Sequence, residues 1–232
     1  MQVALLSDIH SNLNAFSTVL SSLPKTVDEI WITGDLVGYY YDTNETIDLI
    51  KKNKCRVTQG NHDRYLIEFM HDKASLAKYT AKYGTSLQRT LENISKENFD
   101  FIKSLKPTET ITTSRHSFLM CHGSPWDQDK HIYPDVDDTE LEKYLAFSQD
   151  VFIQGHTHYP MNKDYKTKKI INPGSVGQSR NGTKSAHWAL LDTDKLTLDF
   201  KTTAYDKTNL IQQISKNDPE VKYLKSILVE NE

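Results

Sequence analysis

The sequence has few cysteines, no long apolar run and little net charge. Its 232 residues include two cysteines, Cys55 and Cys121, without the spacing of a disulfide framework. No apolar run approaches the ~18 residues of a membrane-spanning helix. Lys and Arg number 28 against 31 Asp and Glu, a formal net charge of −3, with no dense basic block. These features argue against a disulfide-rich secreted protein, a membrane protein and a broad nucleic-acid-binding surface.

The two ends of the chain and its most basic stretch also lack special signals. Segment 163–169, KDYKTKK, is interpreted as the charged rim of a β-hairpin. The first lysine is Lys25, so the N-terminus has no basic start of a secretion signal and opens in a strand-like run. Without linkers, repeats or low-complexity tracts, we expect one domain over residues 1–232. We expect it to be soluble and cytoplasmic, and no pattern indicates its oligomeric state.

Strand-like and helix-like segments alternate over the first 60 residues. Strands are expected at 3–7, 29–33 and 55–59, and helices at 12–23 and 45–52. This alternation is typical of βαβ units around a largely parallel sheet.

The rest of the chain changes from helical to strand periodicity. Helical spacing over about 64–106 predicts a cap-like insertion, and an amphipathic helix is expected at 138–147. A C-terminal helical appendage is expected at about 207–232. Further strands are expected at 109–114, 117–121, 150–154, 168–172, 185–192 and 195–203. We therefore predict an α/β fold, an α+β sandwich in which two mixed β-sheets pack face to face and are flanked by helices.

Polar residues follow five of the expected strands directly. Loops at the carboxyl ends of strands are where α/β sheets gather functional groups. These loops carry D-x-H at 8–10, GDLVG at 34–38, GNHD at 60–63, H-G at 122–123 and GHTH at 155–158. Each motif alone is more often an ordinary turn or a structural histidine, so their joint occurrence carries the inference. A spacing of two in extended backbone would point both side chains of D-x-H, or of H-T-H, to one side.

The residue types in these loops are those of a metal site. Carboxylate, amide and imidazole groups without thiolate suit Mn, Fe or Zn. The candidate ligands are Asp8, His10, Asp35, Asn61, His122, His156 and His158. Seven ligands exceed the about four of a tetrahedral site, and they fit two ions about 3.5–4 Å apart that share a carboxylate. Two divalent cations are therefore expected, with Mn favoured.

This series of motifs resembles the calcineurin-like metallophosphoesterase superfamily over Asp8 to about Arg180. The segments LLSDIHSN and NPGSVGQSR resemble its compact bacterial and archaeal phosphodiesterase branch. The resemblance implies a four-layer fold with a central pair of mixed sheets. It also implies one metal held by Asp8, His10 and His158, a second held by Asn61, His122 and His156, and Asp35 bridging the two.

The implied activity is di-metal-dependent hydrolysis of phosphoesters, in the first place of phosphodiesters. A hydroxide bridging the metals would attack phosphorus in line. The resemblance makes His62 catalytic, either stabilising the transition state or protonating the leaving alkoxide. Asp63 would orient a histidine or cap the following helix. Thr157 would brace its turn through a hydrogen bond between its hydroxyl group and the backbone.

A small-molecule phosphoester or a nucleotide is the expected partner. Candidate substrate-binding residues are Arg64, Trp126, Tyr133, Ser175 and Arg180. Tyr39, Tyr40 and Tyr41, together with the two aromatic candidates, would stack on a nucleobase or simply pack on one another. Cys121 is expected in the core, and four histidines outside the motifs are expected to be structural or exposed. These are His71, His116, His131 and His187, of which His131 is the hardest to assign.

Other functions compatible with the motifs stay open. A hydrolase of dinucleoside polyphosphates such as diadenosine tetraphosphate would have the same fold. A non-catalytic scaffold resembling the subunit of the retromer complex is disfavoured, because that subunit lacks the histidine that His62 retains. The acidic balance disfavours a nuclease, and the short chain disfavours a protein phosphatase.

Overall fold

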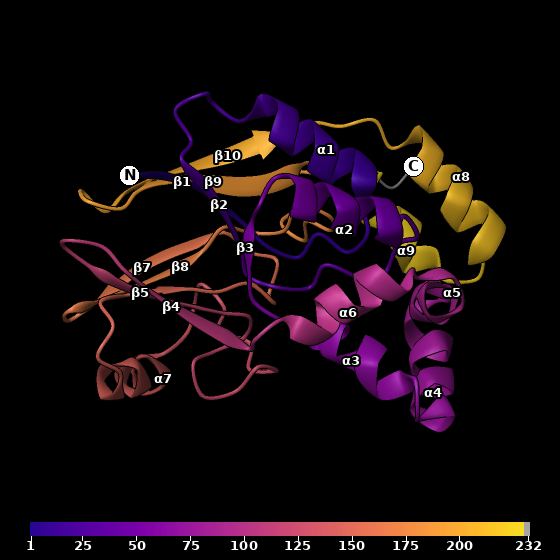
Figure 1. The fold of residues 1–232 in the computed structure, drawn as a ribbon, viewed down its shortest axis with the longest axis horizontal. Helices are drawn as coiled ribbons and strands as arrows, with labels where there is room; N and C mark the ends of the chain where they lie inside the picture. Colours follow the sequence, from indigo (N-terminus) through magenta and orange to yellow (C-terminus); the bar gives the residue numbers. More distant parts are fainter. Residues whose placement is uncertain (230–232) are drawn as a thin grey trace.

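Two five-stranded mixed sheets pack face to face in the computed structural model, which describes residues 1–229 (Figure 1). The first sheet has the order β10-β9-β1-β2-β3. Its strands are β1 (Gln2–Leu6), β2 (Glu29–Ile32), β3 (Arg56–Val57), β9 (Ala186–Asp192) and β10 (Thr197–Thr203). The strands β1, β2 and β3 are parallel, whereas β9 is antiparallel to both β1 and β10.

The second sheet has the order β4-β5-β6-β8-β7. Its strands are β4 (Thr108–Thr112), β5 (Ser117–Cys121), β6 (Val151–Ile153), β7 (Met161–Tyr165) and β8 (Lys168–Asn172). The central strands β5, β6 and β8 are parallel, and β4 and β7 pair with them in antiparallel orientation. The fold class expected from the sequence is therefore confirmed.

Alternation of side chains along each strand builds three hydrophobic layers. Val3 and Leu5 of β1 point into the core between the two sheets, where they meet Phe118 and Met120 of β5. The intervening residues of β1 belong to a second core under the helices α1 and α2. On the far side, Cys121 lies in a third core beneath α7, as expected.

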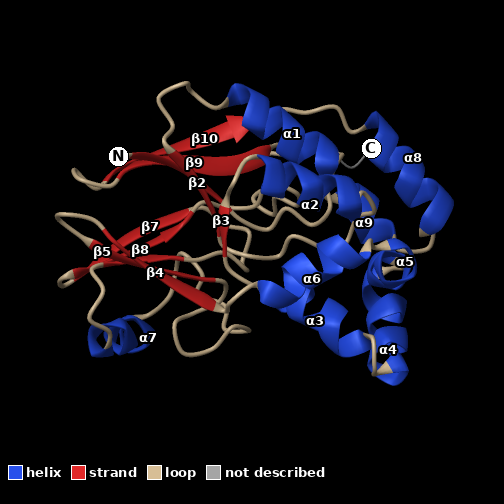
Figure 2. Cartoon of the chain, viewed as in Figure 1, coloured by secondary structure: helices blue, strands red, loops and turns tan. Residues whose placement is uncertain are grey.

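Helices cover the outer faces of both sheets. They are α1 (Leu13–Ser22), α2 (Thr43–Lys52), α3 (Asn61–Phe69), α4 (Lys73–Tyr83), α5 (Ser86–Asn93), α6 (Lys96–Ser104), α7 (Asp138–Glu142), α8 (Thr208–Asn217) and α9 (Lys222–Ser226). Figure 2 shows the strands of both sheets on one side of the molecule and most helices on the other. The segment expected to form a cap-like insertion is the group α3 to α6, which lies beside the ends of the sheets.

The structure corrects several expected boundaries. Strand β7 was not expected, although its hairpin with β8 accounts for the charged segment 163–169. The strand expected at 55–59 shrinks to two residues, and the helix expected at 138–147 ends in a 3-10 turn, Lys143–Ala146. Residues 230–232 of the expected C-terminal appendage lie outside the described residues. Among the described helices, none is long and apolar enough to cross a membrane, and the cytoplasmic location stays a prediction.

Candidate metal centre

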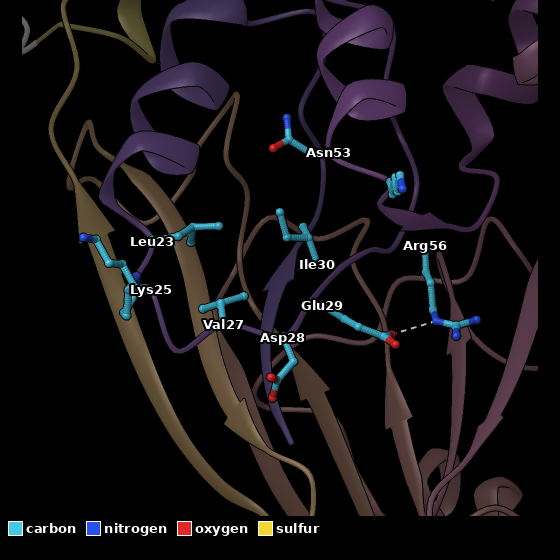
Figure 3. Close-up of a pocket in the computed structure, with 10 residues that line it drawn as sticks. Leu23, Lys25, Val27, Asp28, Glu29, Ile30, Asn53 and Arg56 are labelled. Carbon is cyan, nitrogen blue, oxygen red and sulfur yellow. Dashed lines mark hydrogen bonds and ion pairs between the residues drawn. The ribbon is translucent and has the colours of Figure 1, made fainter.

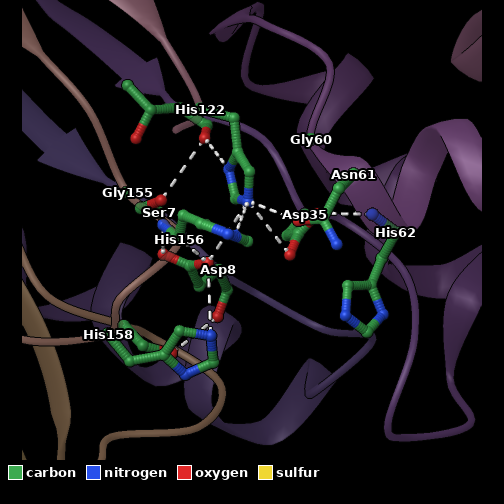
Figure 4. A network of polar contacts seen from close by, with 12 residues as sticks. Ser7, Asp8, Asp35, Gly60, Asn61, His62, His122, Gly155, His156 and His158 are labelled. Atoms are coloured by element: carbon green, nitrogen blue, oxygen red, sulfur yellow. Dashed lines mark hydrogen bonds and ion pairs between the residues drawn. The ribbon is translucent and has the colours of Figure 1, made fainter. Parts of the chain in front are cut away.

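The candidate ligands converge where the two sheets meet at the carboxyl ends of their central strands. Asp8 and Asp35 follow β1 and β2 in the first sheet, and His122 and His156 follow β5 and β6 in the second. Asn61 opens α3. Figure 4 shows these side chains turned toward one another, and every one of them is at most 9% exposed.

Two groups of ligand atoms lie side by side in this centre. The first group is Asp8, His10 and His158, and the second is Asp35, His122 and His156. Within each group the ligand atoms lie within 4.8 Å of one another. Asn61 extends the second group, because its Oδ1 lies 2.9 Å from Nε2 of His122.

Asp35 lies between the two groups. Its Oδ2 is 3.2 Å from Nε2 of His122 in the second group and 3.8 Å from Nε2 of His10 in the first. Its other oxygen, Oδ1, accepts a hydrogen bond of 2.8 Å from the main-chain N–H of His62. Oδ2 thus faces a histidine of each group, whereas Oδ1 is engaged by the main chain.

The four histidines each use one ring nitrogen to donate to the main chain. Nδ1 of His10, His122 and His158 faces the carbonyl oxygens of Val37, Thr33 and Gln178, and Nε2 of His156 faces that of Asp129. A carbonyl oxygen can only accept, so the nitrogen that faces it carries the proton in a neutral ring.

The remaining nitrogens therefore turn lone pairs toward one another. Nε2 of His10 lies 3.2 Å from Nε2 of His158, and Nε2 of His122 lies 3.1 Å from Nδ1 of His156. Lone pairs at this distance repel unless a cation or a proton lies among them. Nitrogen and oxygen donors without thiolate suit Mn, Fe or Zn, so the residues present fit two divalent ions.

Burial favours the neutral, metal-binding form of most of these rings. It lowers the pKa of His10 and His158 well below the usual value and that of His156 to about 3. His122 differs: burial alone would lower its pKa, but the Asp35 carboxylate beside it raises it to about 10.

Five of the candidate metal ligands have a backbone conformation in the left-handed region. Their φ values lie between 52° and 69°, a region that residues other than glycine seldom occupy. They are Asp8, His10, Asp35, His156 and His158. The D-x-H and H-T-H motifs thus present their side chains from tight turns and not from extended backbone, which corrects the reason given for their spacing. Such strain is held in place by the surrounding structure and is typical of functional sites.

His62 lies beside the two ligand groups without joining them. Its ring is buried against Tyr39, with ring centroids 4.7 Å apart, and it lines a cavity next to the centre. Burial lowers the pKa of His62 to about 4. Within residues 1–229, its neighbour Asp63 makes no hydrogen bond to a histidine and accepts hydrogen bonds from main-chain N–H groups, including that of Gly60 at the start of α3. Of the two roles expected for Asp63, the structure thus favours helix capping.

The cavity beside the centre has a volume of about 350 Å³ and an aromatic wall. Tyr39, Tyr65 and Tyr83 line it, together with His131 and Arg180. The Arg180 guanidinium donates hydrogen bonds of 3.1 Å to Oη of Tyr39 and to Oε1 of Gln178. His131 is exposed, as expected, and it also lines this cavity, with its ring centroid 3.9 Å from that of His156.

Four of the five candidate substrate-binding residues do not line this cavity. Arg64 pairs with the Asp129 carboxylate at 2.7 and 2.8 Å. Trp126 packs on Tyr144 in the third core, with ring centroids 5.0 Å apart. Tyr133, in the loop between β5 and α7, is 41% exposed. Ser175 is fully buried, and its hydroxyl donates to the carbonyl oxygen of Asp8.

The three consecutive tyrosines after the GDLVG motif also lie in different surroundings. Tyr39 lines the cavity, whereas Tyr40 and Tyr41 pack against α8 and α9, with the Tyr41 hydroxyl donating to Asp218. Thr157 accepts hydrogen bonds from the Asn172 side chain and, at 3.4 Å, from a main-chain N–H in its own turn, as expected of a brace.

Some residues that line the cavity belong to none of the sequence motifs. Tyr65 and Tyr83 come from α3 and α4, and only the spacing of four between Tyr79 and Tyr83 places two tyrosines on one helix face. A larger cavity of about 670 Å³ lies at the amino end of β2, where Glu29 pairs with Arg56 (Figure 3). Its described lining contains no candidate ligand, so cavity size does not locate the site.

Comparison with known proteins agrees with this geometry. Residues 1–196 match the profile of the calcineurin-like phosphoesterase superfamily domain. The chain belongs to this superfamily. An uncharacterized protein of Methanocaldococcus jannaschii is 30% identical over 235 residues, which cover 93% of this chain and 92% of the relative. This assignment to a phosphoesterase superfamily is consistent with the two groups of possible metal ligands in the structure.

Solved structures with a similar fold include one from a bacterium and one from an archaeon. A metallophosphoesterase from Sphaerobacter thermophilus superposes with a TM-score of 0.79 at 24% identity, covering 99% of this chain and 100% of the other. A hypothetical protein from Pyrococcus horikoshii gives a TM-score of 0.84 at 22% identity, covering 96% and 97%. These similarities establish the four-layer fold.

Proposed function

We propose that this phosphoesterase is a phosphodiesterase that works with two divalent cations, Mn in the first place and Fe or Zn as alternatives. The observation that carries the proposal is the convergence of four imidazole lone pairs and two carboxylates in one buried centre. Asp8, His10 and His158 would hold one ion. Asn61, His122 and His156 would hold the other, with Asp35 between them. When bound, the two ions would lower the pKa of water and neutralise charge on the phosphoryl group.

The charge of the cavity favours a diester over a monoester. Arg180 is the only Lys or Arg side chain in its described lining, which also contains the carboxylates of Asp35 and Asp129. A phosphodiester carries one negative charge and a monoester carries up to two near neutral pH. A lining with so little positive charge beyond the metals suits the singly charged ester. The same argument disfavours a dinucleoside polyphosphate, which carries several charges.

The aromatic wall supports the same choice. A diester has two organic groups, of which one must leave and the other must stay bound. Tyr39, Tyr65 and Tyr83 provide an apolar surface on which such a group would pack. His62, at the same cavity, is in position to contact the phosphoryl group or the leaving oxygen.

Hydrolysis of bis(p-nitrophenyl) phosphate and of p-nitrophenyl phosphate, each with added Mn²⁺, tests the proposal. We expect the diester to be cleaved with the higher kcat/KM. A His62→Ala variant is expected to keep its two metal ions and lose most of its turnover. Faster hydrolysis of diadenosine tetraphosphate than of any diester would favour the polyphosphate hydrolase. Absence of turnover with Mn²⁺, Fe²⁺ and Zn²⁺ would favour a scaffold.

A further inference from the structure

Tyr79 of α4 makes a buried hydrogen bond to the ring of His62. Its Oη lies 2.8 Å from Nδ1 of His62, and the two residues are 6% and 5% exposed. They come from different helices, 17 positions apart in the chain. The bond thus connects α4 to the ring of His62, which lines the cavity beside the metal centre.

The hydroxyl of Tyr79 donates in this bond. In the part of the chain that the structure describes, the other polar group at Oη of Tyr79 is the Ser86 hydroxyl, which acts as a donor to Oη and offsets part of the rise that burial causes in the pKa of Tyr79, so the Tyr79 proton is directed to His62. A buried hydroxyl proton requires an acceptor, and Nδ1 of an imidazole accepts only when it carries no proton. The proton of the neutral His62 ring therefore lies on Nε2.

Gly38 makes room for this contact. A Cβ atom at position 38 would collide with Nδ1 of His62 and would lie 3.1 Å from Oη of Tyr79. A side chain at position 38 would therefore occupy the space in which Tyr79 meets Nδ1 of His62. Of the residues that approach Nδ1 in the described chain, Tyr79 is the one that supplies a polar group.

We propose that Tyr79 is a positioning residue for His62, which it holds as the tautomer protonated on Nε2. This role rests on the proposed phosphodiesterase function. It makes His62 a neutral hydrogen-bond donor to the phosphoryl or leaving oxygen, and not a general acid. To give away its Nε2 proton, His62 would have to take a proton from Tyr79 and leave a buried tyrosinate. Burial raises the pKa of Tyr79 well above its usual value, which disfavours that transfer.

The tautomer is measured directly by the long-range ¹H–¹⁵N NMR spectrum of the histidine rings, recorded with Zn²⁺ because that ion is diamagnetic. His62 is assigned by comparison with the His62→Ala variant. We expect an unprotonated Nδ1 and a protonated Nε2, and a mixture of tautomers in Tyr79→Phe. A protonated Nδ1 in the unaltered protein would overturn the proposal. This measurement needs no turnover, so it decides the role of Tyr79 even if the protein cleaves no diester.

Kinetics on bis(p-nitrophenyl) phosphate then separate positioning from a purely structural effect. We expect Tyr79→Phe to lower kcat about 10- to 100-fold and to change KM by less than about threefold, with unchanged metal content. The same substitution in a His62→Ala background should cost nothing further, because its effect passes through His62. An equal loss in both backgrounds would overturn the proposal.

Tyr223→Phe is the matched control. The ring of Tyr223 lies near that of Tyr39, with centroids 6.2 Å apart, and its buried hydroxyl makes no hydrogen bond within the described residues. Its removal deletes the same atom from the same neighbourhood without touching His62. We expect turnover within about twofold of the unaltered protein. A loss equal to that of Tyr79→Phe would show that any missing hydroxyl in this cluster lowers activity, and it would overturn the specific role of Tyr79.

Discussion

The carboxylate of Asp63 accepts a 2.9 Å hydrogen bond from the main-chain N–H of Leu36, although 27 positions separate them. It also accepts from the N–H groups of Val37 at 3.2 Å and Gly60 at 2.8 Å. One buried side chain thereby joins the loop that carries Asp35 to the helix start that carries Asn61. The two loops carry candidate ligands of the metal centre, and this carboxylate fixes their relative position.

Removal of this carboxylate should reduce both stability and activity. In Asp63→Ala, three N–H groups lose their acceptor, and each unsatisfied buried donor costs about 1–3 kcal/mol. We expect the free energy of unfolding to fall by about 3 kcal/mol. Urea unfolding in the presence of EDTA measures this loss without the contribution of bound metal. Metal content and turnover of the folded variant should also fall.

Asp150→Ala provides a control for the loss of a carboxylate acceptor. Asp150 accepts hydrogen bonds of 2.8 Å from the N–H and the hydroxyl of Ser117, at the amino end of β6 and away from the metal centre. This variant should lose stability but keep its turnover per folded molecule. A stable and fully active Asp63→Ala would contradict the connecting role.

Substitution of Asp35 should affect both metal positions. Its Oδ2 lies 3.2 Å from His122 and 3.8 Å from His10, one in each ligand group. In Asp35→Asn an amide replaces the shared carboxylate, and we expect the metal content to fall at both positions. Atomic emission spectroscopy after dialysis measures the stoichiometry. His10→Ala should empty only one position, and two full sites in Asp35→Asn would exclude bridging.

Metal binding should release protons. Burial raises the pKa of Asp8 to about 7. Burial opposes a proton on His122, but the carboxylates of Asp35 and Asp8 and the Thr33 carbonyl together raise its pKa to about 10. Both groups are therefore largely protonated at about pH 6.5 in the metal-free protein and must lose their protons to bind cations. We expect release of roughly two protons and an apparent metal affinity that rises with pH. Calorimetry in two buffers of different ionisation enthalpy measures the release, and none in either buffer would contradict it.

A methyl group at Gly38 should reduce turnover more than stability. Gly38 and Gly182 have similar φ values of 89° and 84°, so alanine introduces similar backbone strain at each, of about 1–2 kcal/mol. The added Cβ atom meets His62 and Tyr79 at position 38 but no atom within 4 Å at position 182. Thermal unfolding should show a larger stability loss in Gly38→Ala than in Gly182→Ala, because only the former adds a collision with the His62 ring, and steady-state kinetics should show loss of turnover only in Gly38→Ala. Equal turnover would mean that the His62 ring accommodates the methyl group.

Local patterns predicted the fold and the composition of the centre. The continuous apolar runs in VALLS and SFLMC indicate strands buried on both faces, and residues just after parallel strands meet at one edge of the sheet. The seven candidate ligands are brought together for that reason. Trp126 and Ser175 were predicted to bind substrate but do not line the cavity, because residues far away in the sequence surround them. Trp126 packs on Tyr144, and the Ser175 hydroxyl donates to the main-chain carbonyl of Asp8.

The order of polar motifs along the chain was enough to assign the superfamily and to name the atoms that could surround two cations, because each motif lies at the end of its own strand. Only the folded chain decided which nitrogen of each imidazole faces those cations, which tyrosines enclose the cavity, and that Tyr79 touches His62. Those choices depend on hydrogen bonds and ring contacts between different elements. Such contacts form only when helices and sheets pack, so the local sequence around each residue does not predict them.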